Sequence, residues 1–175
     1  MCGIVVDIHA ELECEGVGVM AFLQELTTNK IKLFQLFLQD RDLVDLLTNT
    51  TTEALPAMEL QYEQVFPYPW LDDTVTQVKS YLCFDVTVPR VNTAVVKDVY
   101  LHVWIFTHQQ LMRTATGTRI DRIASEVDYL LNGSTNFGFG KVDLKTLENI
   151  TPAKGFYGRH LVYEVQDFNR ICSKI

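Results

Sequence analysis

Two neighbouring segments with strictly alternating side chains constrain the fold of this 175-residue chain more than any other feature. The first is "VKSYLCFDVTVPRV" (78–91) and the second is "DVYLHVWIFTHQ" (98–109). A period of two places successive residues on opposite faces of a β-strand, and both segments are rich in β-branched and aromatic residues. The second segment is bulky on both faces, so we expect a strand that is central or covered on both sides. The stretch "PRVNTAVVK" (89–97) suits a hairpin connection.

The clearest helical pattern is "GTRIDRIASEVDYLLNGS" (117–134). Apolar residues recur there at spacings of three and four, as one face of an α-helix requires. The stripe consists of Ile120, Ile123, Ala124, Val127, Leu130 and Leu131. The charged residues expected mostly on the other faces are Arg119, Asp121, Arg122, Glu126 and Asp128. Gly133 suits the left-handed position that follows a helix.

The pattern from Thr28 to Asn49 is also helical and divides into two helices. The first can be capped by Thr27, Thr28 or Asn29, and the side chains predicted on its inner face are Ile31, Phe34, Phe37 and Leu38. The second can be capped by Asp40 or Asp42, and its inward side chains are Leu43, Leu46 and Leu47.

A second pair of alternating segments, 139–150 and 158–170, predicts another hairpin. Its alternating apolar residues are Val142, Leu144, Leu161, Tyr163 and Val165. The elements therefore run as two helices, two strands, the long helix and two more strands. The economical arrangement is one α+β domain: a four-stranded, mostly antiparallel sheet (ββαββ) with one long helix across it and N-terminal helices.

Composition and charge exclude several classes of protein. The net charge is −7 and there is no basic stripe, which argues against a nucleic-acid-binding protein. No apolar run reaches the roughly 18 residues of a membrane-spanning helix. The four cysteines are Cys2, Cys14, Cys83 and Cys172, and they contain no C-x-x-C pair. We therefore expect neither a zinc site nor a disulfide framework, but reduced thiols.

The N-terminal "MCGIV" raises the possibility of an N-terminal-nucleophile amidohydrolase built on Cys2. Such a nucleophile uses its own α-amino group as the base, and the similarity to amidotransferases covers only these five residues. Residues 1–19 carry four carboxylates and neither Lys nor Arg. We interpret 1–19 as a doubtful leader from an over-extended start, with translation beginning at Met20 and the single domain spanning 20–175.

Other chemical motifs are weak. His102 and His108 share a strand face, but a metal site would need a third ligand, for which Asp98 is a poor candidate. The G-x-G of "GFGK" (138–141) lacks the rest of a phosphate loop. Asp121, Glu126 and Asp128 are the residues most easily read as acid–base groups, and we expect them to be solvated on an exposed helix face. The sequence therefore predicts no catalytic, cofactor-binding or metal site and no enzymatic activity.

Contact surfaces are the remaining candidates. The loop "VFPYPW" (65–70) contains Phe66, Tyr68 and Trp70, which either form a lid over the core or dock on another subunit. The stretch before the long helix contains Arg113, Arg119 and Arg122, which either pair locally or contact a partner. Because aromatic residues and arginines anchor protein interfaces, we predict an oligomer or partner interface at Phe66, Tyr68, Trp70, Arg113, Arg119 and Arg122.

Much of residues 20–170 carries a resemblance to a known family. The stretches are "VFPYPWLDDTVTQVKSYLCFDVTVPRV", "KDVYLHVWIFTHQQLMRT", "RIDRIASEVDYLLNGS", "FGFGKV" and "GFYGRHLVYEVQDFNR". They resemble neck proteins of tailed bacteriophages, of the tail-terminator or tail-completion type. The resemblance implies a small α/β fold without catalytic residues, in a homo-oligomeric ring that is often six-fold. Such a ring caps the tail tube and joins it to the head.

The resemblance also implies partners and a location. The partners are the major tail-tube protein and the head-completion or adaptor proteins, and genomic DNA passes through the lumen without specific binding, because acidic side chains repel phosphates. The protein would be assembled in the bacterial host cytoplasm and end in the virion, with no membrane contact. A head-side adaptor or stopper on the portal is the alternative within this class.

Overall fold

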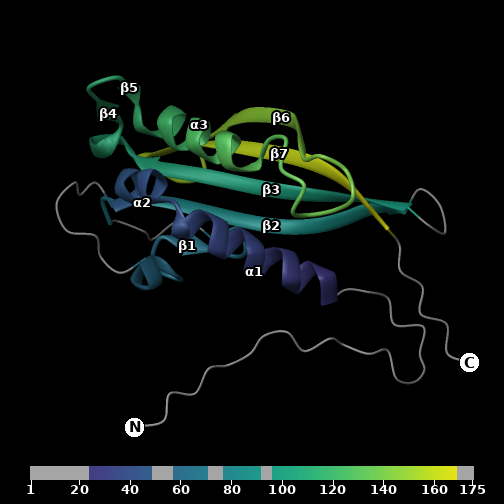
Figure 1. Ribbon diagram of the computed structural model, residues 1–175. Helices are drawn as coiled ribbons and strands as arrows, with labels where there is room; N and C mark the ends of the chain where they lie inside the picture. The colour runs from purple at the N-terminus through teal and green to yellow at the C-terminus, as the bar shows by residue number, and fades with distance from the viewer. Residues whose placement is uncertain (1–23, 49–56, 71–76, 92–95, 169–175) are drawn as a thin grey trace, which may run out of the picture.

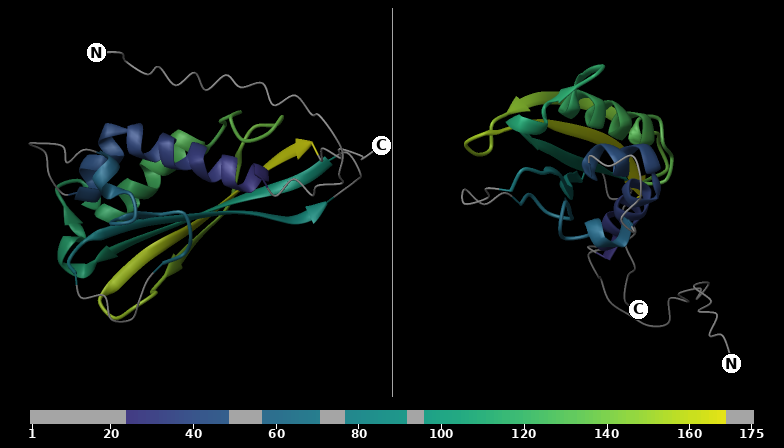
Figure 2. Two further views of the ribbon diagram at one scale, coloured as in Figure 1. Left: turned by 90° about the horizontal axis from the view of Figure 1, so that it is seen from below. Right: turned by 90° about the vertical axis from the view of Figure 1, so that its left-hand side faces the viewer.

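A computed structural model describes residues 24–48, 57–70, 77–91 and 96–168. Three helices pack on one face of a five-stranded sheet (Figure 1). They are α1 (Gln24–Gln39), α2 (Arg41–Thr48) and α3 (Arg119–Leu131). Helix α1 contacts β2, whereas α3 lies over β3 and β7. Figure 2 shows these helices on one side of the sheet.

The sheet has the strand order β1-β2-β3-β7-β6. Its strands are β1 (Val65–Phe66), β2 (Ser80–Val91), β3 (Val96–His108), β6 (Asp143–Ile150) and β7 (Phe156–Phe168). The neighbours β2–β3, β3–β7 and β6–β7 are antiparallel, so both predicted hairpins and the central position of β3 are confirmed. The single α+β domain is confirmed as well.

The prediction of four strands was wrong, because a fifth strand forms in the proline-aromatic loop. Strand β1 runs parallel to β2, with Val65 opposite Leu82 and Phe66 opposite Cys83. Two residues are too few to show a period of two in the sequence. The strand lies at the sheet edge and is followed by Pro67, in accordance with the confinement of proline to edges and strand ends.

The polar stretch between β3 and α3 is also more ordered than expected. It contains a short 3-10 helix, η2 (Gln109–Leu111), and a small hairpin of β4 (Arg113–Thr114) and β5 (Gly117–Thr118). Gly117 has φ +130°, a conformation that glycine adopts without a steric penalty. A second 3-10 helix, η1 (Ala57–Leu60), precedes β1.

The long helix follows its prediction closely. Ile120, Ile123, Ala124, Val127 and Leu131 are buried, and Leu130 packs at the margin of the core. Thr118 is the N-cap, since its hydroxyl accepts a hydrogen bond from the Asp121 amide. Gly133 has φ +80°, as expected for the residue after a helix.

Helix α1 departs from its prediction at both the cap and the inner face. It begins at Gln24, so Thr27, Thr28 and Asn29 lie inside it and do not cap it. Of the predicted inner-face residues, Phe37 is buried and Phe34 and Leu38 pack at the margin of the core, but Ile31 is 52% exposed and Leu33, which was not predicted, is buried. Helix α2 agrees with expectation.

The cap of α2 is Asp40, whose carboxylate accepts a hydrogen bond from the Leu43 amide at 2.7 Å. The predicted inward residues Leu43, Leu46 and Leu47 are buried.

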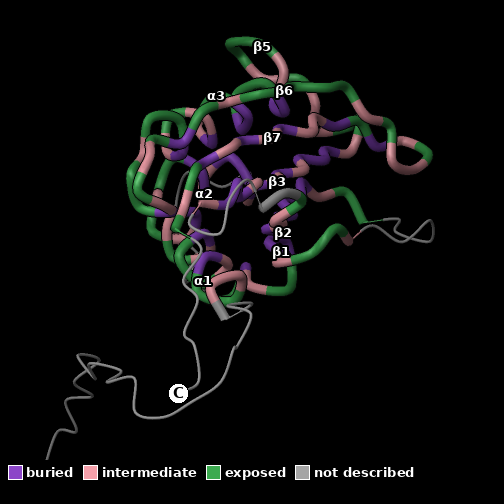
Figure 3. Tube along the Cα trace, turned by 90° about the vertical axis from the view of Figure 1, so that its right-hand side faces the viewer, coloured by how far each residue is buried: buried purple, intermediate pink, exposed green. Residues whose placement is uncertain are grey.

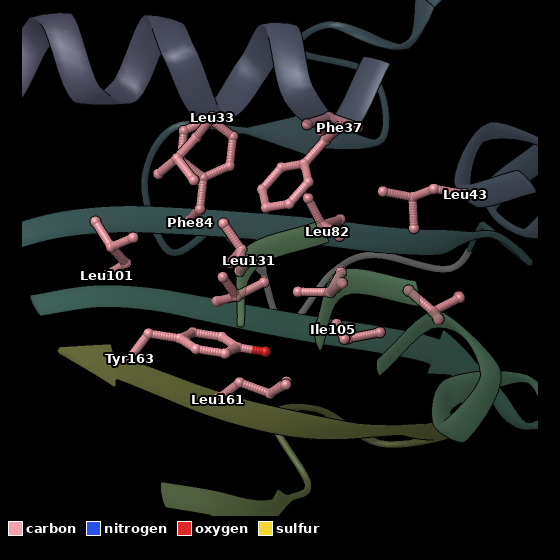
Figure 4. Packing of buried hydrophobic residues seen from close by; sticks show 14 of the residues in the cluster. Leu33, Phe37, Leu43, Leu82, Phe84, Leu101, Ile105, Leu131, Leu161 and Tyr163 are labelled. Atoms are coloured by element: carbon pink, nitrogen blue, oxygen red, sulfur yellow. The ribbon is translucent and has the colours of Figure 1, made fainter. Parts of the chain in front are cut away.

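One continuous core lies between the helices and the sheet (Figure 3). Figure 4 shows Leu33 and Phe37 of α1 above Leu82 and Phe84 of β2, with Leu161 and Tyr163 of β7 farther along. The Tyr163 hydroxyl donates to an Asp128 carboxylate oxygen at 3.2 Å, so the one polar atom of this large buried ring is satisfied.

Some expectations fall outside the described residues. They are the proposals for Cys2, the leader 1–19 and the start at Met20, together with the middle part (92–95) of the hairpin connection predicted at 89–97. Among the described helices, none is long and apolar enough to cross a membrane.

Candidate functional site

The face of the sheet opposite the helices is the candidate site, and we call it the outer face. The proline-aromatic loop leaves part of this face open, and the side chains there come from β2, β3 and β7. All of them are half-buried: Asp85, Thr87, Tyr100, His102, Trp104, His160, Val162 and Glu164. No helix of the described part of the chain covers them. The solvated face of an antiparallel sheet is normally polar. This one carries aromatic and imidazole rings, which is a composition typical of contact surfaces.

The rings form a continuous stack. Along β3, Tyr100, His102 and Trp104 share a face because they are two residues apart. Their successive ring centroids are 6.5 and 5.6 Å apart, with interplanar angles of 27° and 12°. From β7, His160 joins the stack, with its ring 4.8 Å from Trp104 at an angle of 5°.

A hydrogen bond joins the two imidazoles. His102 Nδ1 lies 3.2 Å from His160 Nε2, and His102 Nε2 lies 3.1 Å from the Thr87 hydroxyl. Burial lowers the pKa of His102, although the carboxylate of Asp85 acts in the opposite direction. Burial and the neighbouring His102 lower the pKa of His160, against the effect of Glu148. Both rings are therefore mostly neutral at pH 7.

Ion pairs balance most of the charge around this stack. Lys30 of α1 pairs with Asp85 at 2.6 Å, and Lys145 pairs with Glu164 at 2.9 Å. The Tyr100 hydroxyl donates to Glu164 at 3.3 Å. A near-neutral aromatic surface costs little to desolvate when another protein covers it.

The proline-aromatic loop covers the other end of the outer face. Phe66 is buried and stacks on Trp70, with centroids 4.4 Å apart. Together they pack with Tyr81, Cys83, Phe106 and Phe156 in a second apolar cluster. This is the arrangement of an intramolecular lid, and it occupies two of the three aromatic residues predicted for an interface.

Tyr68 is the exception in the loop, since it is 43% exposed. Its ring contacts the lid edge-on at Phe66, with the two ring centroids 5.9 Å apart. Tyr68 is therefore the aromatic residue of this loop that is best placed for contact with another chain.

The lid also seals Cys83. Its thiol donates to the Trp70 carbonyl at 3.4 Å, and burial raises the pKa of the thiol to about 12. A thiol with such a pKa is protonated at neutral pH and is a poor nucleophile.

The three arginines predicted for an interface differ in how far they are exposed. Arg113 and Arg122 are exposed, but Arg119 is buried at 8% exposure. The guanidinium of Arg119 donates to the Leu111 carbonyl at 2.9 Å and to the Leu46 carbonyl at 2.8 Å. The expectation that Arg119 lies on an outward face of the helix was wrong. Arg119 is the first residue of α3, and its side chain turns back to a carbonyl in the last turn of α2, where helix carbonyls lack intrahelical donors.

Two acidic residues of α3, Asp121 and Glu126, line a groove of about 770 Å³ between α2, α3 and β5. Its lining includes Asp42, Asp45, Asp121, Arg122 and Glu126. Asp121 accepts from Thr118 and Arg159, which together hold the pKa of its carboxyl below the ordinary value. Asp128, the third residue considered as an acid–base group, instead accepts a hydrogen bond from the Tyr163 hydroxyl.

The histidines weighed and set aside as metal ligands, His102 and His108, do not come together. His108 lies at the far end of β3, where its Nδ1 accepts from the Gln110 amide at 3.3 Å. Within the described ranges, no group of three or more His, Cys, Asp or Glu side chains could hold a metal ion. The segment 138–141 is used structurally, since the amides of Phe139 and Gly140 donate to the Gln166 carbonyl.

Sequence reasoning missed the outer face as a site. The available signal was the bulk on both faces of 98–109, which predicted a second covered face. The position of His160 beside this strand could not be read, because its partner His102 is 58 residues away in the chain.

Residues 40–165 match the family model described as YomW, a segment that runs from the cap of α2 into β7. No curated protein matches the chain. Because the match covers well over half of the 175 residues, this chain is a member of the YomW family.

Proposed function

We propose that this chain is a structural protein of a phage virion, in which copies form a ring that caps the tail tube and joins the tail to the head. The observation that carries the proposal is the outer face of the central strand. Tyr100, His102 and Trp104 are half-buried there, next to His160, and no described helix covers them. Aromatic side chains of this kind contribute most to binding free energy when a second protein excludes water from them.

The exposed residues among the predicted interface set add to this surface. Tyr68, Arg113 and Arg122 present side chains to solvent, so they can reach another copy or the tail-tube protein. Phe66, Trp70 and Arg119 have an internal role, because they hold the lid and the end of α2 in place. In this proposal they support the interface without touching the partner.

The charge of the chain fits a lumen through which DNA moves. With a net charge of −7, a ring of six copies would repel phosphates and bind DNA weakly. Tight DNA binding at low salt would contradict this part of the proposal.

The first test is the oligomeric state of the full chain. We expect rings, most simply of six copies, by electron microscopy and by light scattering coupled to size exclusion. A protein that stays monomeric over the whole accessible concentration range, alone and with the tail-tube protein, would refute the proposal. Capture of the portal instead of the tail-tube protein would place it on the head side of the neck.

The second test separates contact residues from supporting residues. Trp104→Ala and Tyr68→Ala should each weaken the ring and leave the monomer folded by circular dichroism. The matched control is Tyr129→Ala, because Tyr129 is a tyrosine of α3 with 81% exposure and is not a predicted contact. Trp70→Ala should instead loosen the lid, since this ring stacks on Phe66. Rings that survive both Trp104→Ala and Tyr68→Ala would exclude these surfaces as the contact.

A further inference from the structure

We propose that His102 and His160 form a proton-operated switch in the outer face. The pair keeps the ring stack intact while it carries at most one additional proton, and a second proton separates the two imidazoles. The local step is independent of the proposed function. Its consequence for ring assembly rests on that function.

The argument begins with the shared hydrogen bond. His102 Nδ1 and His160 Nε2 are 3.2 Å apart, so one nitrogen must carry the hydrogen and the other must accept it. One additional proton is compatible with this geometry. An imidazolium at His102 can donate Nδ1–H to His160 and Nε2–H to the Thr87 hydroxyl, which lies 3.1 Å away.

A second additional proton is not compatible. Both facing nitrogens would then carry hydrogens, and two cationic rings would lie with centroids 5.5 Å apart in a half-buried site. No acceptor would remain between them. The pair must then open, most simply by rotation of His160.

The surrounding charges do not remove this conflict. On β2, Asp85 faces His102, but it is paired with Lys30 of α1. On β6, Glu148 lies opposite His160. The next row of the face holds Glu164 of β7, which is paired with Lys145 and bonded by Tyr100. These carboxylates favour the first proton, whereas no anion lies between the two imidazoles to accept the second.

The separation of the two imidazoles would change the surroundings of Trp104 and therefore the outer face. The His160 ring lies 4.8 Å from the indole at an angle of 5°, so its departure removes one layer of the stack. If copies of the protein meet through the outer face, acid should dissociate the oligomeric ring.

The experiment uses the indole and the imidazoles as separate reporters in the full chain. The sequence has two tryptophans, Trp70 and Trp104, so Trp70→Phe leaves Trp104 as the only indole. We expect its fluorescence to change between pH 7.5 and 4.5 with the titration of His160. The change should disappear in His160→Gln and persist in the control His108→Gln, whose ring lies outside the pair. An unaltered change in His160→Gln would overturn the switch.

Nuclear magnetic resonance of the imidazole Cε1–H groups tests the same step without Trp70→Phe. Because the charge of His102 opposes protonation of His160, His102→Gln should move the His160 midpoint to higher pH. An unchanged or lower midpoint would overturn the coupling. Circular dichroism at each pH shows that the fold persists.

Sedimentation at pH 7.5 and 5 tests the consequence for assembly. Rings that dissociate in acid, and persist there in His160→Gln, support it. Rings that are equally stable at both values refute this consequence. A titrating pair in a chain that never forms rings would support the local switch and count against the proposed function.

Discussion

Removal of the Arg119 guanidinium is the sharpest test of how this domain is held together. Two of its hydrogen bonds reach the carbonyl of Leu46, in the last turn of α2, and the carbonyl of Leu111, at the end of the short helix η2. Methionine retains an unbranched apolar stem and has no hydrogen-bond donor in its side chain. We therefore expect Arg119→Met to destabilise the isolated domain, even where no partner is present.

The magnitude follows from the two bonds. A hydrogen bond from a charged donor contributes about 1.5–3 kcal/mol, and the apolar stem of methionine recovers part of the loss. A net loss of about 3 kcal/mol in the free energy of unfolding corresponds to roughly a 150-fold change in the folding equilibrium. With a urea slope of about 2 kcal/mol/M, the unfolding midpoint should fall by about 1.5 M.

Urea denaturation followed by circular dichroism measures this midpoint. The matched control is Arg122→Met, because Arg122 lies on the same helix with an exposed side chain. That control should change the free energy of unfolding by no more than about 0.5 kcal/mol. If the two variants unfold at the same urea concentration, Arg119 has no structural role and the reasoning fails.

Three further perturbations have defined outcomes. A Cβ at Gly158 would lie 2.3 Å from the Ile105 carbonyl oxygen, so Gly158→Ala should lower the free energy of unfolding by about 1–3 kcal/mol, measured by urea denaturation. The control Gly140→Ala should be near neutral, because the nearest atom to its Cβ would be 3.8 Å away. Equal effects of the two substitutions would contradict this. With a pKa of about 12, the Cys83 thiol should resist Ellman's reagent at pH 8 until urea unfolds the chain, and peptide mapping that finds it modified in the folded protein would refute its burial. Burial lowers the pKa values of His102 and His160, so the unfolded chain binds more protons than the folded chain below about pH 6.5. The free energy of unfolding should therefore fall as the solution is acidified, and it should fall less steeply in His102→Gln. An identical pH dependence of the two proteins would disprove the linkage.

The regular elements were predictable because each leaves a periodic signal in the chain. Alternation identified β2, β3 and β7, and spacings of three and four identified α3, including its capping glycine Gly133. These patterns are long enough to be read without tertiary information. The two-residue strand β1 is too short for any period, and its place in the sheet depends on pairing with β2.

Other errors arose where tertiary contacts override local patterns. Ile31 and Leu33 are equally apolar, and the packing of α1 against β2 decides that Leu33 is buried and Ile31 is exposed. Arg119 is charged, so sequence alone places it in water. The carbonyls that hold it belong to residues 8 and 73 positions away.

The candidate site was predictable only in part. The loop residues Phe66 and Trp70 were recognised as candidates for a lid or a contact, and they form the lid. The outer face required the register between β3 and β7, which sets Trp104 opposite His160. No local pattern contains that register, because the β4–β5 hairpin, the helix α3 and the strand β6 separate the two segments.

The pairing of β3 along its whole length has a mechanical consequence. All 13 of its residues are paired with β7, from Val96 opposite Phe168 to His108 opposite Phe156. Hydrogen bonds in an antiparallel pair lie perpendicular to the strands. Tension applied along β3 is therefore shared by many bonds that must break together, as in a lap joint under shear, whereas tension across the sheet would open them one at a time like a zip. A pull along this strand is the direction in which the domain resists force best.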